Sequence, residues 1–222
     1  MKSRFVYFVS AALCGAVVMG VELSASRLLA PYFGNSLYVW TNVIAVVLLA
    51  LAGGYFYGGK LADRRPEPKL YFSLIAATGF WILLIPFLIQ FFSEVVVSLS
   101  PNLAFAVRLG SLFIAALFFL LPLFMLGMMV PFTLKLLQPS AEHVASVSGR
   151  LSMVSTLGSL VGTFLPTFFL IPLLGTTKTF LVLGFVLLFL AVYGLKNRLF
   201  WVRRCCCSVF FCLYLTFMLG LT

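Results

Sequence analysis

Long apolar runs separated by short loops constrain this chain more than any other feature. A run of about 20 apolar residues crosses a hydrocarbon core of about 30 Å, and backbone groups in lipid need internal partners, which here means helices. Hydrophobic residues make up 63% of the chain and charged residues only 9%, whereas a soluble domain carries about a quarter charged residues. The sequence therefore predicts an all-α integral membrane protein. The six main runs cover approximately Phe5–Ala30, Leu37–Gly59, Leu70–Phe92, Ala104–Leu137 (or Leu109–Leu137), Ser148–Leu174 and Thr177–Leu195.

We expect a bundle of about seven transmembrane helices in two parts. Residues 1–198 would form a six-helix bundle, and residues 199–222 would add a C-terminal helix that begins near Cys205 and is barely long enough to span. The run Ser148–Leu174 is rich in small residues, which allow close helix approach. It is therefore the helix that we expect to lie deepest in the bundle.

The basic residues predict one orientation. Cytoplasmic loops of membrane proteins are enriched in Lys and Arg, and a cytoplasmic N-terminus leaves only Arg27, Arg108 and Lys178 on the far side. We therefore expect a multi-pass protein of the cell (inner, cytoplasmic) membrane with its N-terminus inside. The remaining 12 of the 15 basic residues would lie on the cytoplasmic side: Lys2, Arg4, Lys60, Arg64, Arg65, Lys69, Lys135, Arg150, Lys196, Arg198, Arg203 and Arg204.

Loop and packing signals divide the chain further. We expect a charged loop over Lys60–Lys69, closed by prolines that cannot continue a helix, and a nearly uncharged loop over Glu94–Asn102. A kink is expected at Pro86. Two Gly-x-x-x-Gly pairs mark faces where a neighbouring helix can approach closely. These helix-packing residues are Gly54 and Gly58 in the second run and Gly158 and Gly162 in the fifth.

Several functional classes find no support in the residues. The formal charge of +10 lies in topology-determining loops and not in a basic stripe interleaved with stacking aromatics, so we expect no nucleic-acid partner. The single histidine, His143, cannot supply the ligands of a haem or, with the Cys205–Cys207 run, a tetrahedral metal site. We expect no metal, no cofactor and no catalytic residue, and lipidation of Cys205–Cys207 remains an alternative to apolar filler.

Glu22 is the only carboxylate inside an apolar run. An ionisable group at membrane depth is a functional-site hypothesis by default, and the alternative is a structural ion pair. Arg27 is five residues further on, about 140° around a helix, so the two side chains do not face each other. We expect Glu22 to point into the bundle toward Arg108 or Asn42, and the candidate substrate-binding or buried-charge residues are Glu22, Arg27, Asn42 and Arg108.

The segment Gly59-Lys-Leu-Ala-Asp63-Arg64-Arg65 resembles the charged loop between the second and third helices of the major facilitator superfamily. In that family the acid and the arginine pair with neighbouring helix ends and latch one conformation of the transporter. The resemblance implies a conformational-latch loop formed by Gly59, Asp63, Arg64 and Arg65. The alternative is an ordinary positive-inside loop.

A closer resemblance covers most of Val9–Leu195. The segments concerned are Glu22-Leu23, Arg27–Gly34, Leu37–Thr41 and Gly58–Pro66, followed by Gly149-Arg150, Ser155–Ser159, Gly162–Pro166 and Ile171–Thr176. Together they resemble the membrane region of fused major-facilitator/spermidine synthase-like proteins. This implies a facilitator-like half with a link to polyamines.

Such fusions carry a soluble aminopropyltransferase-like domain after the spans, whereas this sequence reaches Thr222 without one, so we expect no enzymatic activity. Two hypotheses remain. The first is a transporter-like or solute-binding membrane protein. The second is a structural or anchoring subunit of a larger membrane complex, or a docking partner for a separately encoded aminopropyltransferase-like enzyme. Expected partners are the lipid bilayer and either further copies of the chain or other membrane-protein subunits.

Overall fold

The structure is a computed structural model that describes residues 2–99, 105–138 and 144–196. Within these ranges it contains helices and no strand. Two π-helical turns, η1 and η2, lie inside the fourth and fifth spans, where they join α5 and α7. The elements are α1 (Lys2–Phe33), α2 (Leu37–Arg64), α3 (Pro68–Leu99), η1 (Ala106–Gly110), α5 (Ser111–Leu137), α6 (Val144–Leu165), η2 (Pro166–Leu170), α7 (Ile171–Leu174) and α8 (Thr176–Lys196).

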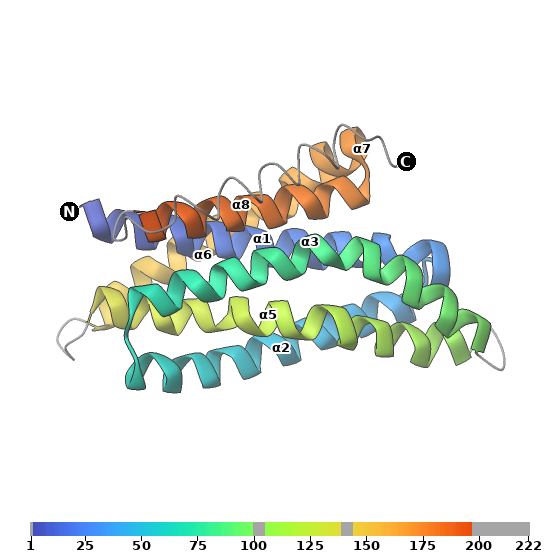
Figure 1. Cartoon of the computed structure of the whole chain (residues 1–222), viewed down its shortest axis with the longest axis horizontal. Helices are drawn as coiled ribbons and strands as arrows, with labels where there is room; N and C mark the ends of the chain where they lie inside the picture. The colour runs from blue at the N-terminus through green and yellow to red at the C-terminus, as the bar shows by residue number, and fades with distance from the viewer. Residues whose placement is uncertain (1, 100–104, 139–143, 197–222) are drawn as a thin grey trace.

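Six of the described helical segments are long and apolar enough to cross a membrane. Figure 1 shows them running back and forth, so that the start of α1 and the end of α8 lie at the same end of the bundle. The chain thus has the all-α, multi-pass architecture predicted from its apolar runs. The expected seventh span and the proposed boundary at residue 199 lie outside the described residues.

Several helices extend beyond the predicted spans. The expected loop at Lys60–Lys69 is wrong in its first half, because α2 continues to Arg64; the expected loop at Glu94–Asn102 is wrong likewise, because α3 continues to Leu99. Only the hydrocarbon crossing demands apolar residues, and a helix can continue into the headgroup region with charged side chains. After α1 the chain turns through Gly34, whose positive φ of 76° suits glycine.

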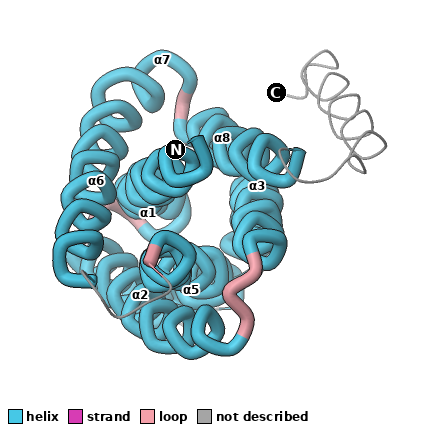
Figure 2. The backbone as a smooth tube through the Cα atoms, turned by 90° about the vertical axis from the view of Figure 1, so that its left-hand side faces the viewer, coloured by secondary structure: helices cyan, strands magenta, loops and turns pink. Residues whose placement is uncertain are grey.

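The six spans pack mainly in three pairs, α2 with α5, α1 with α6 and α3 with α8. The view along the bundle in Figure 2 shows α2 beside α5 on one side, α6 beside α1, and α3 beside α8. No pair joins helices that are consecutive in the chain. The bundle is therefore held by contacts between its first three spans and its last three.

Glycines bring the backbones together in two of these pairs. A Cβ added to Gly54 of α2 would collide with the Phe124 carbonyl oxygen of α5, and one added to Gly58 would lie 2.5 Å from the Met128 Cα. In the other pair, additions to Gly158 and Gly162 of α6 would collide with the carbonyl oxygens of Ala12 and Ala16 in α1. A side chain at any of these positions would force the helices apart.

The two crossings are equivalent, and the equivalence extends to single residues. A Cβ added to Gly15 of α1 would lie 2.5 Å from the Ser155 carbonyl oxygen, and one added to Gly127 of α5 would lie 3.0 Å from the Leu51 carbonyl oxygen. Residues 12, 15 and 16 thus correspond to 124, 127 and 128, and residues 51, 54 and 58 correspond to 155, 158 and 162.

In the third pair, α3 and α8 meet symmetrically. A Cβ at Gly79 would lie 3.0 Å from the Gly184 carbonyl oxygen, and one at Gly184 would lie 3.0 Å from the Gly79 carbonyl oxygen. The spans α1–α3 and η1–α8 therefore form two three-span repeats related by a pseudo-two-fold axis near this crossing. Because each repeat has an odd number of spans, the two repeats run in opposite directions through the bundle.

The expectation that the fifth span lies deepest is wrong. Among the six spans, the one formed by α6, η2 and α7 is the least buried; inside it only Leu151, Gly158, Gly162 and Pro166 are buried. Small residues show where one neighbouring helix approaches, but they do not show how many neighbours surround a span. Here α1 covers one face of α6, and the side chains on the other faces of that helix are mostly exposed.

A buried hydroxyl cluster ties three helices together near the N-terminal end of α1. The Tyr71 Oη of α3 lies 2.8 Å from the Ser10 Oγ of α1, and the Thr133 hydroxyl of α5 donates to it at 2.9 Å. All three side chains are fully buried. Their mutual bonds satisfy polar groups that lipid could not.

Candidate functional site

Glu22 lies on α1 beside the interface with α6. It is seven residues, almost two full turns, beyond Gly15, so both residues project from nearly the same side of α1, the side that meets Ser155 and Ser159. The Glu22 side chain is half-buried, and it makes no hydrogen bond or ion pair within the described part of the chain. The structure therefore places a carboxylate at membrane depth without a protein partner there.

The structure does not bring Glu22 to Asn42 or Arg108. Instead, the Asn42 amide donates to the Arg108 carbonyl oxygen and to the Ser111 Oγ, both at 2.8 Å. The Arg108 guanidinium lies 5.1 Å from the centre of the Tyr38 ring, a cation–π contact. Asn42 and Arg108 thus join the start of α2 to η1, and both amide protons of Asn42 are used.

At the opposite end of the bundle, Asp63 forms an ion pair with Lys135 of α5. The Lys135 Nζ and the Asp63 Oδ1 are 2.9 Å apart. Gly59 is open, with nothing within 4 Å of an added Cβ, and Arg64 and Arg65 are exposed. Of the four residues in the expected latch, Asp63 is therefore the one that joins α2 to another helix, and its partner was not singled out from the sequence.

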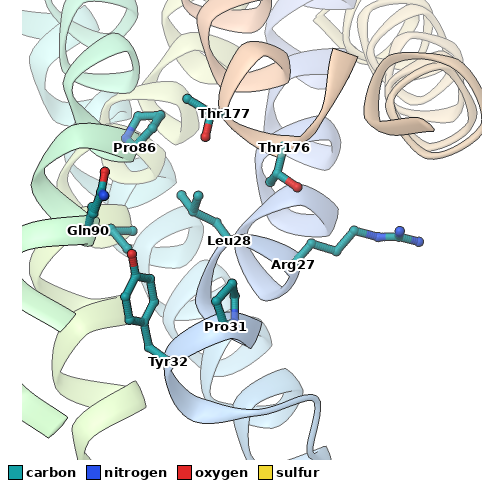
Figure 3. Close-up of a pocket in the computed structure, with 9 residues that line it drawn as sticks. Arg27, Leu28, Pro31, Tyr32, Pro86, Gln90, Thr176 and Thr177 are labelled. Carbon is teal, nitrogen blue, oxygen red and sulfur yellow. The ribbon is translucent and has the colours of Figure 1, made fainter. Parts of the chain in front are cut away.

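A cavity of about 370 Å³ opens between α1, α3 and α8 at the end of the bundle away from the N-terminus. Figure 3 shows Tyr32 and Gln90 on one side of it, Thr176 and Thr177 at the start of α8, and Arg27 at its open edge with the guanidinium directed outward. None of the nine lining residues is acidic. The cavity is only partly enclosed and opens to the surface of the bundle.

The cavity was not predicted, although Arg27 was a candidate residue. Its walls come from three spans that are distant in sequence, and the fact that Tyr32, Gln90 and Thr176 converge depends on how those spans pack. Two further hydroxyls without partners among the described residues, those of Ser24 and Ser93, are buried one helical turn from the lining residues Leu28 and Ile89.

The His, Cys, Asp and Glu side chains of the described residues are scattered. The described residues contain no group of three or more such side chains that could hold a metal ion. Cys14 is buried, while His143 and Cys205–Cys207 lie outside the described ranges. The described residues therefore offer a lone carboxylate on one helix face, an ion pair between α2 and α5, and a polar cavity.

No known protein family, curated protein or solved structure matches the chain.

Proposed function

We propose that this chain is a non-catalytic, transporter-like membrane protein that binds a cationic solute through Glu22, with polyamines as the first solutes to test. The observation that carries the proposal is the pseudo-two-fold relation between the spans α1–α3 and η1–α8. Inverted repeats of this kind recur in secondary transporters, whose substrate sites lie near the bilayer midplane at the interface between repeats.

The position of Glu22 supports this proposal. Its helix, α1, belongs to the first repeat and packs against α6 of the second, so the carboxylate lies beside a boundary between repeats. A charged group at membrane depth is costly unless it is paired or reaches water. A bound amine would supply the missing counter-charge. Because the sequence resembles the membrane region of spermidine synthase-like proteins, spermidine is the first amine to test.

The test is solute binding by the purified full chain in detergent. We expect spermidine, or another amine from a panel, to raise the melting temperature, and the Glu22→Gln variant to weaken its apparent affinity by about tenfold or more, because a charged hydrogen bond contributes about 1.5–3 kcal/mol. Glu94→Gln is the matched control, since Glu94 is an exposed carboxylate near the end of α3. Equal affinity for the wild type and Glu22→Gln would remove Glu22 from the site.

A second function, a structural or anchoring subunit, is favoured by the open face of the fifth span. Large apolar side chains there are exposed over several turns, among them Met153, Leu157, Leu160, Phe164 and Phe168. Either lipid or another membrane protein would cover such a face. Gentle detergent purification followed by mass spectrometry distinguishes the functions: a stoichiometric protein partner favours the subunit, and a chain that carries only solute favours transport.

A further inference from the structure

We propose that the cavity between α1, α3 and α8 binds an anionic group of phosphate type, held at its mouth by Arg27 and the Thr176 hydroxyl. This site is separate from Glu22 and does not depend on the proposed transport function. The phosphate chemistry could come from a lipid headgroup or from a soluble anion, and the experiment below separates the two sources.

The polar lining of the cavity consists of groups that can donate hydrogen bonds. Arg27 provides a permanently charged guanidinium that matches phosphate oxygens in geometry; it is directed outward from the open edge (Figure 3), so its flexible side chain must turn toward the mouth to hold the anion. Hydroxyls or an amide come from Tyr32, Gln90, Thr176 and Thr177. No carboxylate is among the lining residues, although the Glu94 carboxylate lies near the Tyr32 phenol. The remaining walls are apolar, including Leu28 and Ile89, so an occupant with an anionic end and an apolar body fits both parts.

The local charge is also unbalanced. Arg27 and the nearby Lys178 are exposed, and neither takes part in an ion pair among the described residues, where the one ion pair joins Lys135 and Asp63. Glu94 lies one turn beyond Gln90 on α3, outside the lining. Arg27 and Lys178 are thus opposed by the single carboxylate of Glu94. The mouth of the cavity therefore has an excess positive charge that a bound anion would compensate.

The depth of the site suits a lipid phosphate. Arg27 is six residues before the end of α1, about 9 Å along the helix, and Thr176 is the first residue of α8. Both therefore lie near the level where a helix leaves the hydrocarbon core, which is where headgroups are found. The first N–H groups of the 21-residue α8 also point toward this end and add a favourable field for an anion.

The experiment titrates the purified full chain in detergent with three probes and follows thermal unfolding. The probes are dioctanoyl phosphatidylglycerol, dioctanoyl phosphatidylcholine and inorganic phosphate. We expect phosphatidylglycerol, inorganic phosphate or both to stabilise the wild type, while zwitterionic phosphatidylcholine binds at least about tenfold more weakly. Stabilisation by phosphatidylglycerol alone identifies a lipid headgroup, and stabilisation by phosphate with the same dependence on Arg27 identifies a soluble anion.

Four variants test the assignment to the cavity. Arg27→Gln is expected to weaken anion binding about tenfold, Thr176→Val to weaken it several-fold, and Arg27→Lys to keep part of the affinity because the charge remains. Lys178→Gln removes the same charge at the same end from a residue outside the lining, so it should weaken the affinity clearly less than Arg27→Gln does.

Three results would overturn the proposal. They are no stabilisation of the wild type by either anionic probe, unchanged binding in both Arg27→Gln and Thr176→Val, and an equal loss in Lys178→Gln and Arg27→Gln. The last result would assign the effect to general surface charge. Arg27 is exposed, so its replacement is not expected to prevent folding.

Discussion

The Tyr71 phenol holds α1, α3 and α5 together through two hydroxyl partners inside the bundle. The Ser10 and Thr133 hydroxyls also lie 2.8 and 2.7 Å from carbonyl oxygens of their own helices, those of Tyr7 and Met129, to which each can donate its single proton. Loss of the Tyr71 hydroxyl would therefore leave neither of them without a partner. Its contribution to stability should thus be moderate, as for most hydrogen bonds between membrane helices.

We expect Tyr71→Phe to destabilise the bundle by about 1 kcal/mol, because it deletes two interhelical hydrogen bonds and preserves the ring. Thermal unfolding in detergent measures the effect. Tyr193→Phe is the control, since the Tyr193 side chain is exposed on α8. If the two variants had equal melting temperatures, the cluster would not stabilise the contact between the three helices.

At this scale the sequence reveals charges but not their surroundings. Glu22 and Arg27 could be singled out because ionised side chains are rare in apolar runs. The contacts of Asn42 with Arg108 and Ser111 could not be predicted, since they depend on how α2 lies against η1. The partner of Asp63 was hidden for the same reason: Lys135 is 72 residues away in sequence and becomes a neighbour only when α2 packs on α5.

Among the elements, the glycine crossings decide which helices can touch. Within the same helices as Gly54 and Gly158, Gly59 and Gly149 have nothing within 4 Å of an added Cβ. Each repeat therefore has one helix that carries both a glycine packed against a neighbouring backbone and a glycine with free space around it. Alanine stabilises a helix interior by about 0.5–1 kcal/mol relative to glycine unless its methyl group collides with a neighbour.

We therefore expect opposite effects from the two kinds of Gly→Ala substitution. Gly54→Ala and Gly158→Ala should destabilise the bundle by about 1–3 kcal/mol, because overpacking separates the paired backbones. Gly59→Ala and Gly149→Ala should be neutral or slightly stabilising. Melting temperatures and size-exclusion profiles in detergent test both, and equal behaviour of Gly149→Ala and Gly158→Ala would contradict the α1–α6 contact.

The same glycines show where sequence reasoning about elements succeeds and where it fails. Small residues at a spacing of four identify one close contact, and the structure has such contacts at Gly54, Gly58, Gly158 and Gly162. In a membrane, however, a lipid-facing surface is as apolar as a buried one. The pattern of α6 therefore could not distinguish a central helix from one that is packed along a single face.

For the whole molecule, the distribution of charge predicts the orientation in the membrane. The ends of α2, α5 and α8 lie with the start of α1 at the end that carries Lys60, Arg64, Arg65, Lys135 and Lys196. The other end carries Gly34 and the anion cavity. The positive-inside rule predicts that the first end lies in the cytoplasm.

Cysteine labelling tests this orientation. In a chain whose five native cysteines are replaced by alanine, we expect an Asn35→Cys variant to react with a membrane-impermeant maleimide in intact cells, because Asn35 is exposed in the turn between α1 and α2. A Glu67→Cys variant should react only after permeabilisation. The reverse pattern would show that the N-terminus lies outside.

The interleaved pairing of the spans has a consequence for biosynthesis. Gly54 leaves the ribosome 73 residues before its partner Gly127, and Ala12 leaves it 146 residues before Gly158. At about 5–20 residues per second, α2 waits about 4–15 s for α5, and α1 waits about 7–29 s for α6. During translation the early spans therefore expose their glycine faces to lipid or to insertion factors, and the native contacts form only as the second repeat arrives.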